Sequence, residues 1–498
     1  MMFVTPQQMK QLEELTDKSG VSYGEMMSRA GHALAETIMQ RYPQKQCVLF
    51  LAGSGNNGGD CYVAARVLKK AGWRPEGLAP LGKPNTYIAN TALELAKQDG
   101  IPIYEEAYDF LFGEPEIVVD GLFGTGFKGE LSQGVRKLLS RTEGKIRIAC
   151  DIPSGGDALT GSVSEGAVPA ELTVTFGAVK LGMTQYPLRK LCGEILTADI
   201  GIPAEAFRKL KPAPIRVLDQ AYLAEHPLTP YAPDAYKQQN GEILAVVGSK
   251  RMRGAAVLSV TAAMRCGAGM VTCAAPEPVL TAVMDKTPEA LCLPLEDDWR
   301  GFSLCEENRE ALLAALAGKD ALLIGCGLGV TDETTELVKL LLQESRCPVI
   351  LDADGLNAVA GCIDCIPKGR TILTPHPGEA ARLLGTDTAS VQADRQNAAL
   401  TIAERTGAAV ILKGAGTIVT DGREMAVCML GNPGMAKAGS GDVLAGITAA
   451  IAAGEKQSLF ETACQAAAIH AAAGDKAAEQ SQRYMLPQDV IGALQEIL

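Results

Sequence analysis

The chain has 498 residues, of which 47% are hydrophobic and 21% are charged. These fractions are typical of a globular protein, and the length predicts two or three domains. The formal net charge of −12 argues against binding to nucleic acid, which needs clustered lysine and arginine. The sequence has no apolar run long enough to span a membrane and no secretory signal. We therefore expect a cytoplasmic protein that binds neither nucleic acid nor membranes.

Fourteen cysteines are scattered along the chain, mostly inside apolar runs. Without a secretory signal, this pattern predicts reduced thiols. Cys362 and Cys365 form one C-x-x-C pair, but a zinc site usually takes four ligands, and no second pair or histidine lies close in sequence. We interpret the cysteines as structural, and a metal or redox role of this pair stays open as the alternative.

The first half of the chain alternates short apolar runs with helix-length segments. Thr5 with Gln8 predicts a capping box at the start of the first helix, and Pro6 suits its first turn. Continuous apolar runs that end in glycine or aspartate, such as CVLFLAGSG and EIVVDGLFGTG, are typical of a parallel sheet covered on both faces. In such sheets ligands bind at the carboxyl ends of the strands.

A proline-rich stretch with little apolar periodicity covers residues 201–240, which predicts a linker. A second series of alternating strands and helices follows it. We expect two three-layer α/β domains, over residues 1–215 and 225–498, with a linker region over 216–240.

The first apolar strand leads into a glycine-rich loop. Gly53, Gly55 and Gly58 have the G-x-G-x-x-G spacing of dinucleotide-binding loops, and residues 124–129 repeat that spacing. Two such loops in one domain lower the value of either as a fingerprint. The acidic residue expected about 20 positions on, at the end of the next strand, is missing. A dehydrogenase that binds a nicotinamide cofactor is therefore the least favoured interpretation.

Polar side chains follow three of the apolar strands at the point where each strand ends. They are Asn56, Asn57 and Asp60, then Asp120, then Asp151 and Ser154. The carboxyl ends of parallel strands meet at one edge of a sheet, so we expect these groups to lie together. Their oxygens suit a hard cation, and a remaining carboxylate can move protons. Each residue alone could cap a turn, but the whole set favours a site.

The segments GSGNNGGD, VVDGLFGTGFKGE and DIPSG resemble the NAD(P)H-hydrate epimerases, and the resemblance covers nearly all of residues 5–210. It implies a Rossmann-like fold that interconverts the R and S hydrates of NADH and NADPH. It also implies K⁺ held by Asn57, Asp120 and Ser154, with Asp151 as the acid/base group. The implied substrate contacts are Asn56, Asn57, Gly58, Gly59, Asp60, Gly124, Thr125, Gly126, Phe127, Lys128, Gly129, Glu130 and Asp151.

Two positions depart from that epimerase pattern. Cys61 stands where glycine usually follows NNGGD, and Gly156 stands where leucine is frequent after DIPSG. Both are adjacent to implied functional positions, so they concern the fine geometry of the site more than its activity.

The strongest motif of the second half is AKAGSGDVLAGITAAIAAG, residues 436–454. Gly439 and Gly441 stand at the predicted start of an apolar helix, where free backbone N–H groups bind phosphate. Asp442 in the first turn can take the proton of an attacking hydroxyl, so the motif indicates phosphoryl transfer. The alternative is an aspartate that only complements the helix dipole.

This motif resembles the ribokinase-like fold. GAAVLS, GCGLG, LDADGLN, LTPHPGEAARLL and LKGAGTIV resemble the ADP- or ATP-dependent NAD(P)H-hydrate dehydratases over about residues 225–498. The resemblance implies ADP or ATP as co-substrate and Mg²⁺ as cofactor. It implies nucleotide contacts at Lys413, Gly414, Ala415, Gly416, Thr417 and Gly441, and hydrate contacts at Ala255, Gly327, His376 and Asp442, of which Asp442 is the catalytic base.

Three residues of this half need separate comment. His376, flanked by prolines, could be structural or part of the site, and Glu379 three residues on could order a Mg²⁺–water network. Cys326 replaces the proline that is usual in the GPGLG form of its loop.

We therefore predict a bifunctional enzyme that epimerises NAD(P)H hydrates and dehydrates the S form, giving NAD(P)H, phosphate, and AMP or ADP. We also expect a homo-oligomer. A ribokinase-like small-molecule kinase fused to a non-catalytic ligand-binding module stays as the alternative. The choice between ADP and ATP is open.

Overall fold

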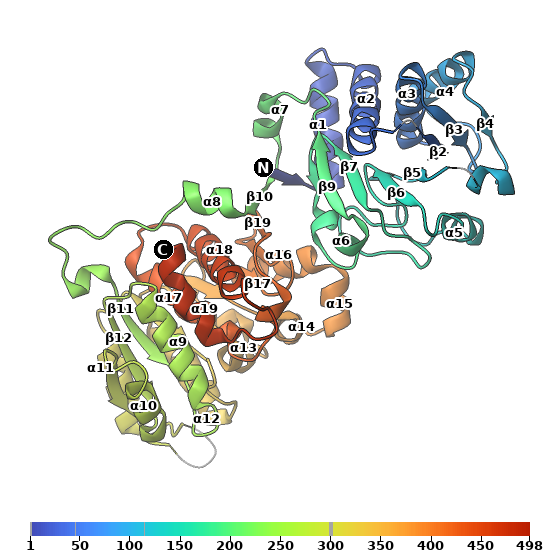
Figure 1. The fold of residues 1–498 in the computed structure, drawn as a ribbon. Coiled ribbons are helices and arrows are strands. Elements are labelled where there is room, and N and C mark those ends of the chain that lie inside the picture. Colours follow the sequence, from blue (N-terminus) through green and yellow to red (C-terminus); the bar gives the residue numbers. More distant parts are fainter. Residues whose placement is uncertain (1, 45, 114, 298–301) are drawn as a thin grey trace. The chain divides into compact units, whose positions relative to one another are not determined.

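The computed structural model describes residues 2–44, 46–113, 115–297 and 302–498 (Figure 1). The chain separates into two compact units, Met1–Ile215 and Arg216–Leu498. Among the described residues, no helix combines the length and the apolarity that crossing a bilayer requires.

The first unit begins with the predicted capped helix. In α1 (Pro6–Lys18), Thr5 Oγ1 accepts the N–H of Gln8 at 3.1 Å, and the Gln8 side chain accepts the N–H of Thr5 at 2.9 Å. The capping box is thereby confirmed. The next helix, α2 (Tyr23–Arg41), packs against α3 (Asn56–Lys70).

A seven-stranded sheet forms the centre of this unit, in the order β4-β3-β2-β5-β6-β7-β9. All its neighbouring strands are parallel. The strands are β2 (Cys47–Ala52), β3 (Arg74–Leu78), β4 (Ile103–Tyr104), β5 (Ile117–Gly121), β6 (Ile146–Cys150), β7 (Leu172–Phe176) and β9 (Glu194–Ala198). The other elements are β1 (Met2–Val4), α4 (Tyr87–Gln98), η1 (Asp109–Phe112), α5 (Gln133–Ser140), β8 (Val179–Lys180), η2 (Leu181–Thr184), α6 (Leu188–Leu191) and α7 (Ala204–Lys209).

Alternate residues of β2 show that both faces of this sheet are covered. Val48 and Phe50 belong to a core with residues of α1 to α4, whereas Leu49 and Leu51 belong to a second core with residues of α5. Side chains alternate between the faces of a strand, so a strand between two cores is apolar at every position. This is the reason for the unbroken apolar run before the glycine-rich loop.

The second unit contains a longer sheet, in the order β13-β12-β11-β14-β15-β16-β17-β18-β19-β10. Its neighbouring strands are parallel except β18, which is antiparallel to β17 and β19. The strands are β10 (Ile215–Leu218), β11 (Glu242–Val246), β12 (Met270–Ala275), β13 (Leu291–Pro294), β14 (Ala321–Ile324), β15 (Val349–Leu351), β16 (Thr371–Leu373), β17 (Ala409–Leu412), β18 (Ile418–Thr420) and β19 (Met425–Cys428).

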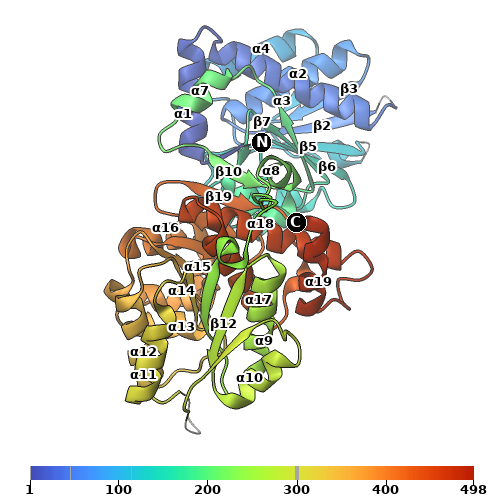
Figure 2. The ribbon, with the colours of Figure 1, turned by 90° about the vertical axis from the view of Figure 1, so that its left-hand side faces the viewer.

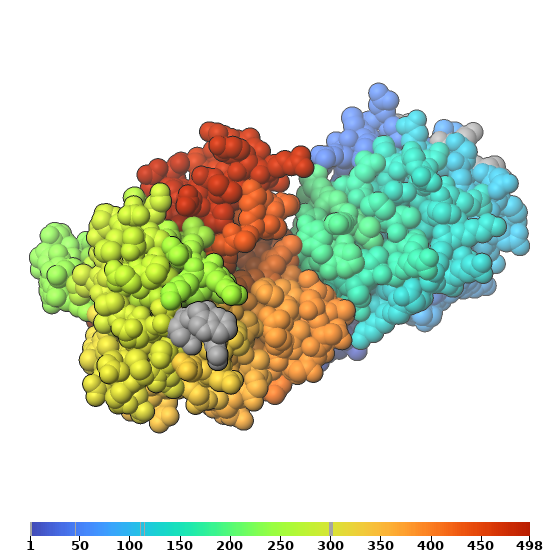
Figure 3. All heavy atoms as spheres, turned by 90° about the horizontal axis from the view of Figure 1, so that it is seen from below, coloured from blue at the N-terminus to red at the C-terminus, as the bar shows by residue number. Residues whose placement is uncertain are grey.

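Helices cover both faces of this second sheet (Figure 2). On one side, α9 (Arg253–Arg265), α17 (Ser440–Gly454) and α19 (Pro487–Ile497) pack together with α18 (Leu459–Ala477), and on the other lie α12 (Asp332–Glu344), α13 (Ala353–Val359) and α14 (Pro377–Leu384). The shorter or peripheral elements are α8 (Gln220–Glu225), η3 (Lys237–Asn240), α10 (Glu277–Met284), α11 (Glu306–Leu316), η4 (Ile363–Cys365), α15 (Thr388–Ala393), α16 (Arg395–Thr406) and η5 (Pro433–Met435). Surface from segments far apart in the sequence, coloured lime, yellow and orange, meets on the face of this unit that Figure 3 shows.

The stretch expected to be a linker contains regular structure. It holds α7, β10, α8 and η3, and β10 pairs in parallel with β19, so it belongs to the second sheet. The strand is only four residues long and follows two closely spaced prolines, Pro212 and Pro214. Its pairing partner is more than 200 residues away, so no local sequence pattern revealed it.

Candidate active sites

The glycine-rich loop after β2 is shaped by close backbone contacts. A Cβ atom on Gly58 would lie 2.0 Å from the carbonyl oxygen of Gly53, and one on Gly53 would lie 1.9 Å from that of Leu122. Glycine is needed where two backbones approach this closely. The spacing therefore lets α3 begin directly against the loops that follow β2 and β5.

Asp120, Ser154 and Asn57 lie together where β5, β6 and β2 end. Ser154 donates from Oγ to Asp120 Oδ1 at 2.6 Å and from its backbone N–H to Oδ2 at 2.9 Å. Burial raises the pKa of Asp120, and the hydrogen bonds from Ser154 oppose that rise. The Asn57 side chain donates to the carbonyl oxygens of Phe123 and Cys150, each at 3.0 Å. The result is a cluster of carboxylate, hydroxyl, amide and carbonyl oxygens, the donor set that hard cations prefer.

Asp151 is held by a buried lysine. Its Oδ1 atom accepts from Lys180 Nζ at 2.5 Å, from Thr175 Oγ1 at 3.0 Å and from the N–H of Phe176 at 3.2 Å. Lys180 is only 1% exposed. Asp151 has a φ of 70°, a left-handed conformation that costs a non-glycine residue about 1–3 kcal/mol and is typical of functional positions.

Two further carboxyl groups lie near this ion pair. Burial, and next the charge of Asp151, raises the pKa of Asp60 well above its ordinary value. Burial also raises the pKa of Glu13 from α1, although Lys180 opposes that rise. A carboxyl that favours its protonated form thus lies beside the Lys180-bound carboxylate of Asp151.

The remaining expected epimerase contacts lie in the first turn of α3 and on the loop that follows β5. Asn56 accepts from Thr86 Oγ1 at 2.7 Å, and a Cβ on Gly124 would touch the Asn57 side chain at 3.4 Å. The carboxylate of Glu130 instead accepts hydrogen bonds from Arg136 at 3.0 Å and from Ser164 at 2.7 Å. These two contacts give Glu130 a structural role in its loop. The other expected contacts in these two segments are Gly59, which is buried, Thr125 and Phe127, which are half-buried, and Gly126, Lys128 and Gly129, which are exposed.

The two departures from the epimerase pattern fit their surroundings. A Cβ on Gly156 would lie 2.3 Å from Leu188 Cδ1, so Leu188 occupies space that a larger residue at 156 would need. Cys61 is fully buried, and its Sγ lies 2.2 Å from where Gly121 would carry a Cβ. The packing around both positions is thus matched to the residues present.

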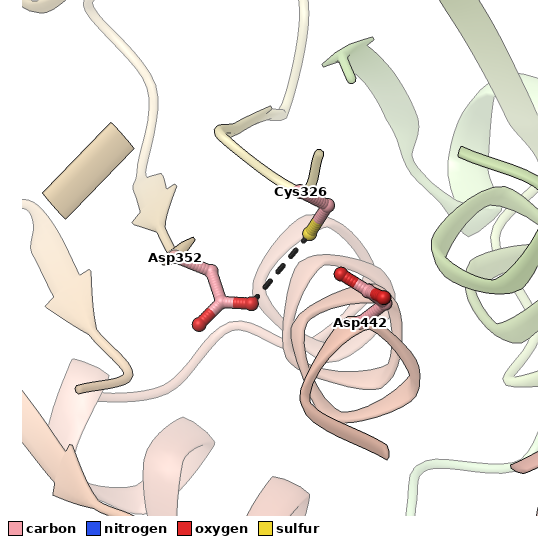
Figure 4. A group of neighbouring side chains, drawn as sticks. All are labelled: Cys326, Asp352 and Asp442. Atoms are coloured by element: carbon pink, nitrogen blue, oxygen red, sulfur yellow. Dashed lines mark hydrogen bonds between the residues drawn. The ribbon is translucent and has the colours of Figure 1, made fainter. Parts of the chain in front are cut away.

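In the second unit, the N-terminus of α17 meets residues from three strand ends. Gly439 is the N-cap with a φ of 98°, which a glycine adopts without strain. A Cβ on Gly441 would lie 3.1 Å from Lys413 Nζ and 3.8 Å from Asp352 Oδ2. Asp442 follows in the first turn of the helix, and Figure 4 shows it opposite Asp352.

Asp352, Lys413 and Asp442 form a charged cluster at this helix start. Asp352 is 1% exposed, and its Oδ1 accepts from Lys413 Nζ at 2.7 Å. Burial alone would lower the pKa of Lys413, but Asp352 and Glu379 together raise it. Burial, followed by the charge of Asp352, raises the pKa of Asp442 to about 7, although Lys413 opposes this. Asp442 can therefore exchange a proton near neutral pH.

His376 has a clear structural role at the start of α14. Its Nδ1 accepts the N–H of Gly378 at 2.9 Å, and the Glu379 carboxylate accepts the N–H of His376 at 2.7 Å. This is a reciprocal cap in which both side chains are engaged. The imidazole remains about half exposed, so it can still contact a ligand.

The expected hydrate and nucleotide contacts form two further groups. A Cβ on Gly327 would lie 2.7 Å from Ala255 Cβ, so these two positions are neighbours. The loop Lys413–Thr417 is held by Arg395, whose side chain is only 7% exposed. Its guanidinium donates to the carbonyl oxygens of Ala415 at 2.8 Å, Leu412 at 3.1 Å and Lys413 at 3.3 Å. Gly414 and Ala415 are exposed on this loop, and Gly416 and Thr417 are half-buried.

Four residues of these sites were not predicted from the sequence as functional, namely Lys180, Glu13, Asp352 and Arg395. Lys180 and Asp352 each end an otherwise apolar run, and that position is a usable signal. Glu13 and Arg395 lie in amphipathic helices, where a charged residue carries no such signal.

Two family models match this chain, one in each of its two units. The family model for NAD(P)H-hydrate dehydratase matches residues 243–496, and that for the YjeF-related protein N-terminus matches residues 24–182. The chain is similar to the bifunctional NAD(P)H-hydrate repair enzyme Nnr of Moorella thermoacetica (37% identity, covering 100% of this chain and 97% of the relative) and of Escherichia coli K12 (32%, covering 97% and 91%). A ribokinase-like superfamily protein of Enterococcus faecalis, of known structure, matches with a TM-score of 0.51 and 25% identity, covering 57% of this chain and 95% of that one. The chain thus belongs to the family of bifunctional NAD(P)H-hydrate repair enzymes.

Proposed function

We propose that this protein repairs damaged NADH and NADPH with two activities in one chain. The first unit interconverts the R and S hydrates, and the second dehydrates the S hydrate at the expense of ADP or ATP. The observation that carries this proposal is Asp442, a buried carboxyl with a pKa of about 7 in the first turn of a glycine-capped helix. Family membership supports the assignment of both units.

Epimerisation needs acid/base chemistry at the hydroxyl-bearing ring carbon. Asp151 supplies the carboxylate, positioned by Lys180 and Thr175, and the raised pKa of Asp60 keeps a proton available beside it. Protonation of the hydroxyl lets the ring nitrogen lone pair expel water, and water added to the opposite face of the planar ring gives the other epimer. The proton returns to the same pair of carboxyls.

The oxygen cluster of Asn57, Asp120 and Ser154 is our proposed K⁺ site. The fit rests on the oxygens gathered here: the Phe123 and Cys150 carbonyl oxygens both accept from Asn57 Nδ2, and the Ser154 hydroxyl, which accepts from the N–H of Phe123, donates to the buried Asp120 carboxylate. An oxygen-rich set with one carboxylate suits a large monovalent cation. Bound K⁺ would supply positive charge that holds the hydrate hydroxyl near Asp151.

Dehydration needs the hydroxide of the hydrate to become a good leaving group. Asp442 removes the proton of the hydroxyl, whose oxygen then attacks the terminal phosphate of ADP or ATP and releases AMP or ADP. The backbone N–H groups of Gly439 and Gly441 and the ammonium of Lys413 hold the transferring phosphate. The ring nitrogen lone pair then expels phosphate, and loss of a neighbouring ring proton restores the double bond of NAD(P)H.

We propose that Mg²⁺ binds together with the nucleotide phosphates. Mg²⁺ keeps several of its waters and takes few protein ligands. Both oxygens of Glu379 contact His376, and Oε2 lies 3.7 Å from Lys413 Nζ, so Glu379 fits a contact through water. Bound Mg²⁺ would neutralise charge on the phosphates.

The test is an assay with the equilibrium mixture of R and S hydrates, in which the recovery of NADH absorbance is followed with ADP, with ATP or with neither. We expect complete recovery that depends on a nucleotide. Recovery of only the S fraction would overturn the epimerase assignment, and accumulation of a stable phosphorylated hydrate would overturn the dehydratase assignment.

A further inference from the structure

Cys326, Asp352 and Asp442 bring three metal-ligand atoms together at the start of α17 (Figure 4). The thiol sulfur and one carboxylate oxygen of each aspartate all lie within 4.8 Å of one another. Cys326 comes from the loop after β14, Asp352 follows β15, and Asp442 lies in the first turn of the helix. The sulfur is the unusual member, because the dehydratases that this domain resembles usually have proline at that position.

The orientation of Asp352 leaves one oxygen directed at the sulfur. Its Oδ1 accepts from Lys413 Nζ at 2.7 Å and from Thr374 Oγ1 at 2.6 Å, whereas Oδ2 lies 3.7 Å from Cys326 Sγ. A tetrahedral zinc ion with Zn–S of about 2.3 Å and Zn–O of about 2.0–2.2 Å sets sulfur and oxygen about 3.5 Å apart. These two atoms therefore already have the spacing of zinc ligands. The ligand oxygen of the half-buried Asp442 lies within 4.8 Å of both atoms, and a side-chain rotation can bring it into the coordination shell.

The charge of the cluster also favours a divalent cation. Two carboxylates face one lysine, and Cys326 is completely buried between them. Burial, and next the charge of Asp352, raises the pKa of the Cys326 thiol well above its ordinary value, so the thiol keeps its proton until a metal displaces it. A divalent cation, two carboxylates, one thiolate and the Lys413 ammonium sum to zero, and Glu379, 3.7 Å from Lys413 Nζ, adds one negative charge beside them. The mixed sulfur and oxygen set selects Zn²⁺ over Mg²⁺.

We propose that Cys326, Asp352 and Asp442 form a binding site for Zn²⁺ that inhibits the dehydratase. Zinc would bond to the sulfur and to one oxygen of each aspartate, and the thiol proton would leave to solvent without any change of oxidation state. Three protein ligands leave a fourth position for water. Inhibition follows because the metal occupies the carboxylate that must accept the hydrate proton. The inhibition rests on the proposed function, but the binding does not.

The binding test uses the full-length protein without nucleotide, because ADP and ATP themselves bind zinc. Cys362 and Cys365 are first replaced by serine, since this pair is partly exposed and can bind the same ions. Cd²⁺ then serves as the probe, because a cadmium–thiolate bond absorbs in the ultraviolet, and Zn²⁺ is titrated in competition. We expect one equivalent to bind with this absorption band.

Variants identify the ligands in the same background. Cys326→Ala is expected to abolish the band and to weaken zinc binding by more than about tenfold, since even an indirect partner of a metal ligand contributes about 10–100-fold. Asp352→Asn is expected to weaken binding while keeping the band. Cys292→Ala, which removes an exposed thiol of β13, is the matched control and should change neither. An unchanged band and affinity in Cys326→Ala would overturn the proposal, as would the absence of binding by the parent protein.

The inhibition arm measures S-hydrate dehydration with Mg²⁺ present and at buffered free Zn²⁺, and each variant is compared with its own rate without zinc. We expect zinc to inhibit the parent protein and to have at least tenfold less effect on Cys326→Ala. Equal sensitivity of both would overturn the inhibitory role. If zinc binds as described but the zinc-free protein with Mg²⁺ and nucleotide does not dehydrate the hydrate, the proposed function fails while the metal site stands.

Discussion

Lys180 Nζ and Asp151 Oδ1 lie 2.5 Å apart in an ion pair whose lysine is almost completely buried. The same ammonium donates to Thr175 Oγ1 and to the carbonyl oxygen of Phe176, each at 3.0 Å. Lys180 is thus held by three oxygens at the end of β7, and it fixes the carboxylate of a residue whose backbone is left-handed. A buried charge with this many partners sets the position of its neighbour.

The first prediction concerns this lysine. Lys180→Met is expected to reduce epimerisation strongly, because Asp151 loses the cation that orients it. Removing one partner of a buried ion pair also costs about 3–5 kcal/mol of stability. Dehydration of purified S hydrate should continue at the normal rate, because Asp442 lies in the other unit. Chemical denaturation and separate assays of the R and S hydrates measure these effects.

Arg41→Met is the matched control for this substitution. It breaks the exposed pair that Arg41 forms with Glu194 at 2.8 Å, and exposed pairs contribute at most about 1 kcal/mol. Neither activity should change. Normal epimerisation by Lys180→Met in folded protein would show that Asp151 does not depend on the lysine.

The surroundings of Asp151 could be predicted only in part from the sequence. Asp120, Asp151 and Ser154 were predicted to meet because parallel strands bring their carboxyl ends to one edge, and the structure places them at neighbouring strand ends. The partner of Asp151 was not predicted. Lys180 lies 29 residues away at the end of β8, and its contact with Asp151 depends on side-chain direction rather than on the order of strands in the sheet.

In the second unit, too, a local pattern predicted one element of the site but not its neighbours in space. The start of α17 was predicted from its glycines, but the charge around Asp442 comes from Asp352 and Lys413, which follow two other strands. Their distance from Asp442 depends on the order of the strands in the sheet, and local patterns do not specify that order. His376 shows the reverse case, because its capping partnership with Glu379 is local.

The second prediction is the pH dependence of dehydration. The pKa of Asp442 is raised to about 7, and only its deprotonated form accepts the hydroxyl proton. The rate should therefore be constant at high pH and fall about tenfold per unit as the pH drops below about 7. His470 is not the source of this titration, because burial lowers its pKa to about 4. The measurement is kcat/KM for the S hydrate against pH.

Variants separate Asp442 from His376 in this profile. Asp442→Asn is expected to lower kcat by about 10²–10⁴-fold, the usual contribution of a general base. His376→Asn keeps a side chain that can cap α14 and should leave the titration near pH 7 in place. If the rate of His376→Asn no longer changed with pH near 7, the histidine and not Asp442 would be the proton acceptor.

The third prediction applies the same pKa shift to stability. The pKa of Asp442 is higher in the folded than in the unfolded state, so the folded state binds more protons between the ordinary carboxyl pKa of 3.8 and about 7. Stability should therefore fall as the pH rises through that window. Asp442→Asn removes this term and should be more stable than the parent protein at pH 8. Urea denaturation at pH 4 and pH 8 tests this, and a less stable variant at pH 8 would contradict it.

The fourth prediction concerns the nucleotide loop. Arg395→Met should raise the KM for ADP or ATP with little change in epimerase activity. The loop Lys413–Thr417 loses the guanidinium that donates to the carbonyl oxygens of Lys413 and Ala415 and of the preceding Leu412. Buried acceptors left without donors cost about 1–3 kcal/mol. Arg382→Met is the control, since it removes an exposed donor to Asn357 and should change stability by less than about 0.5 kcal/mol. If the two variants had the same KM for the nucleotide, the loop Lys413–Thr417 would not be part of the nucleotide site.

The fifth prediction tests the proposed potassium site. Replacing K⁺ by Li⁺ should slow epimerisation and leave S-hydrate dehydration unchanged, because the oxygen cluster of Asn57, Asp120 and Ser154 belongs to the first unit alone. Ser154→Ala removes the hydroxyl that bonds to Asp120 and should weaken the activation by K⁺ about 10–100-fold, the usual effect of losing a contact that orients a metal ligand. Ser132→Ala, which removes only the N-cap of α5, should leave the K⁺ dependence intact. The half-activating K⁺ concentration is the measured quantity, and a value that is the same in Ser154→Ala and the parent protein would place the cation elsewhere.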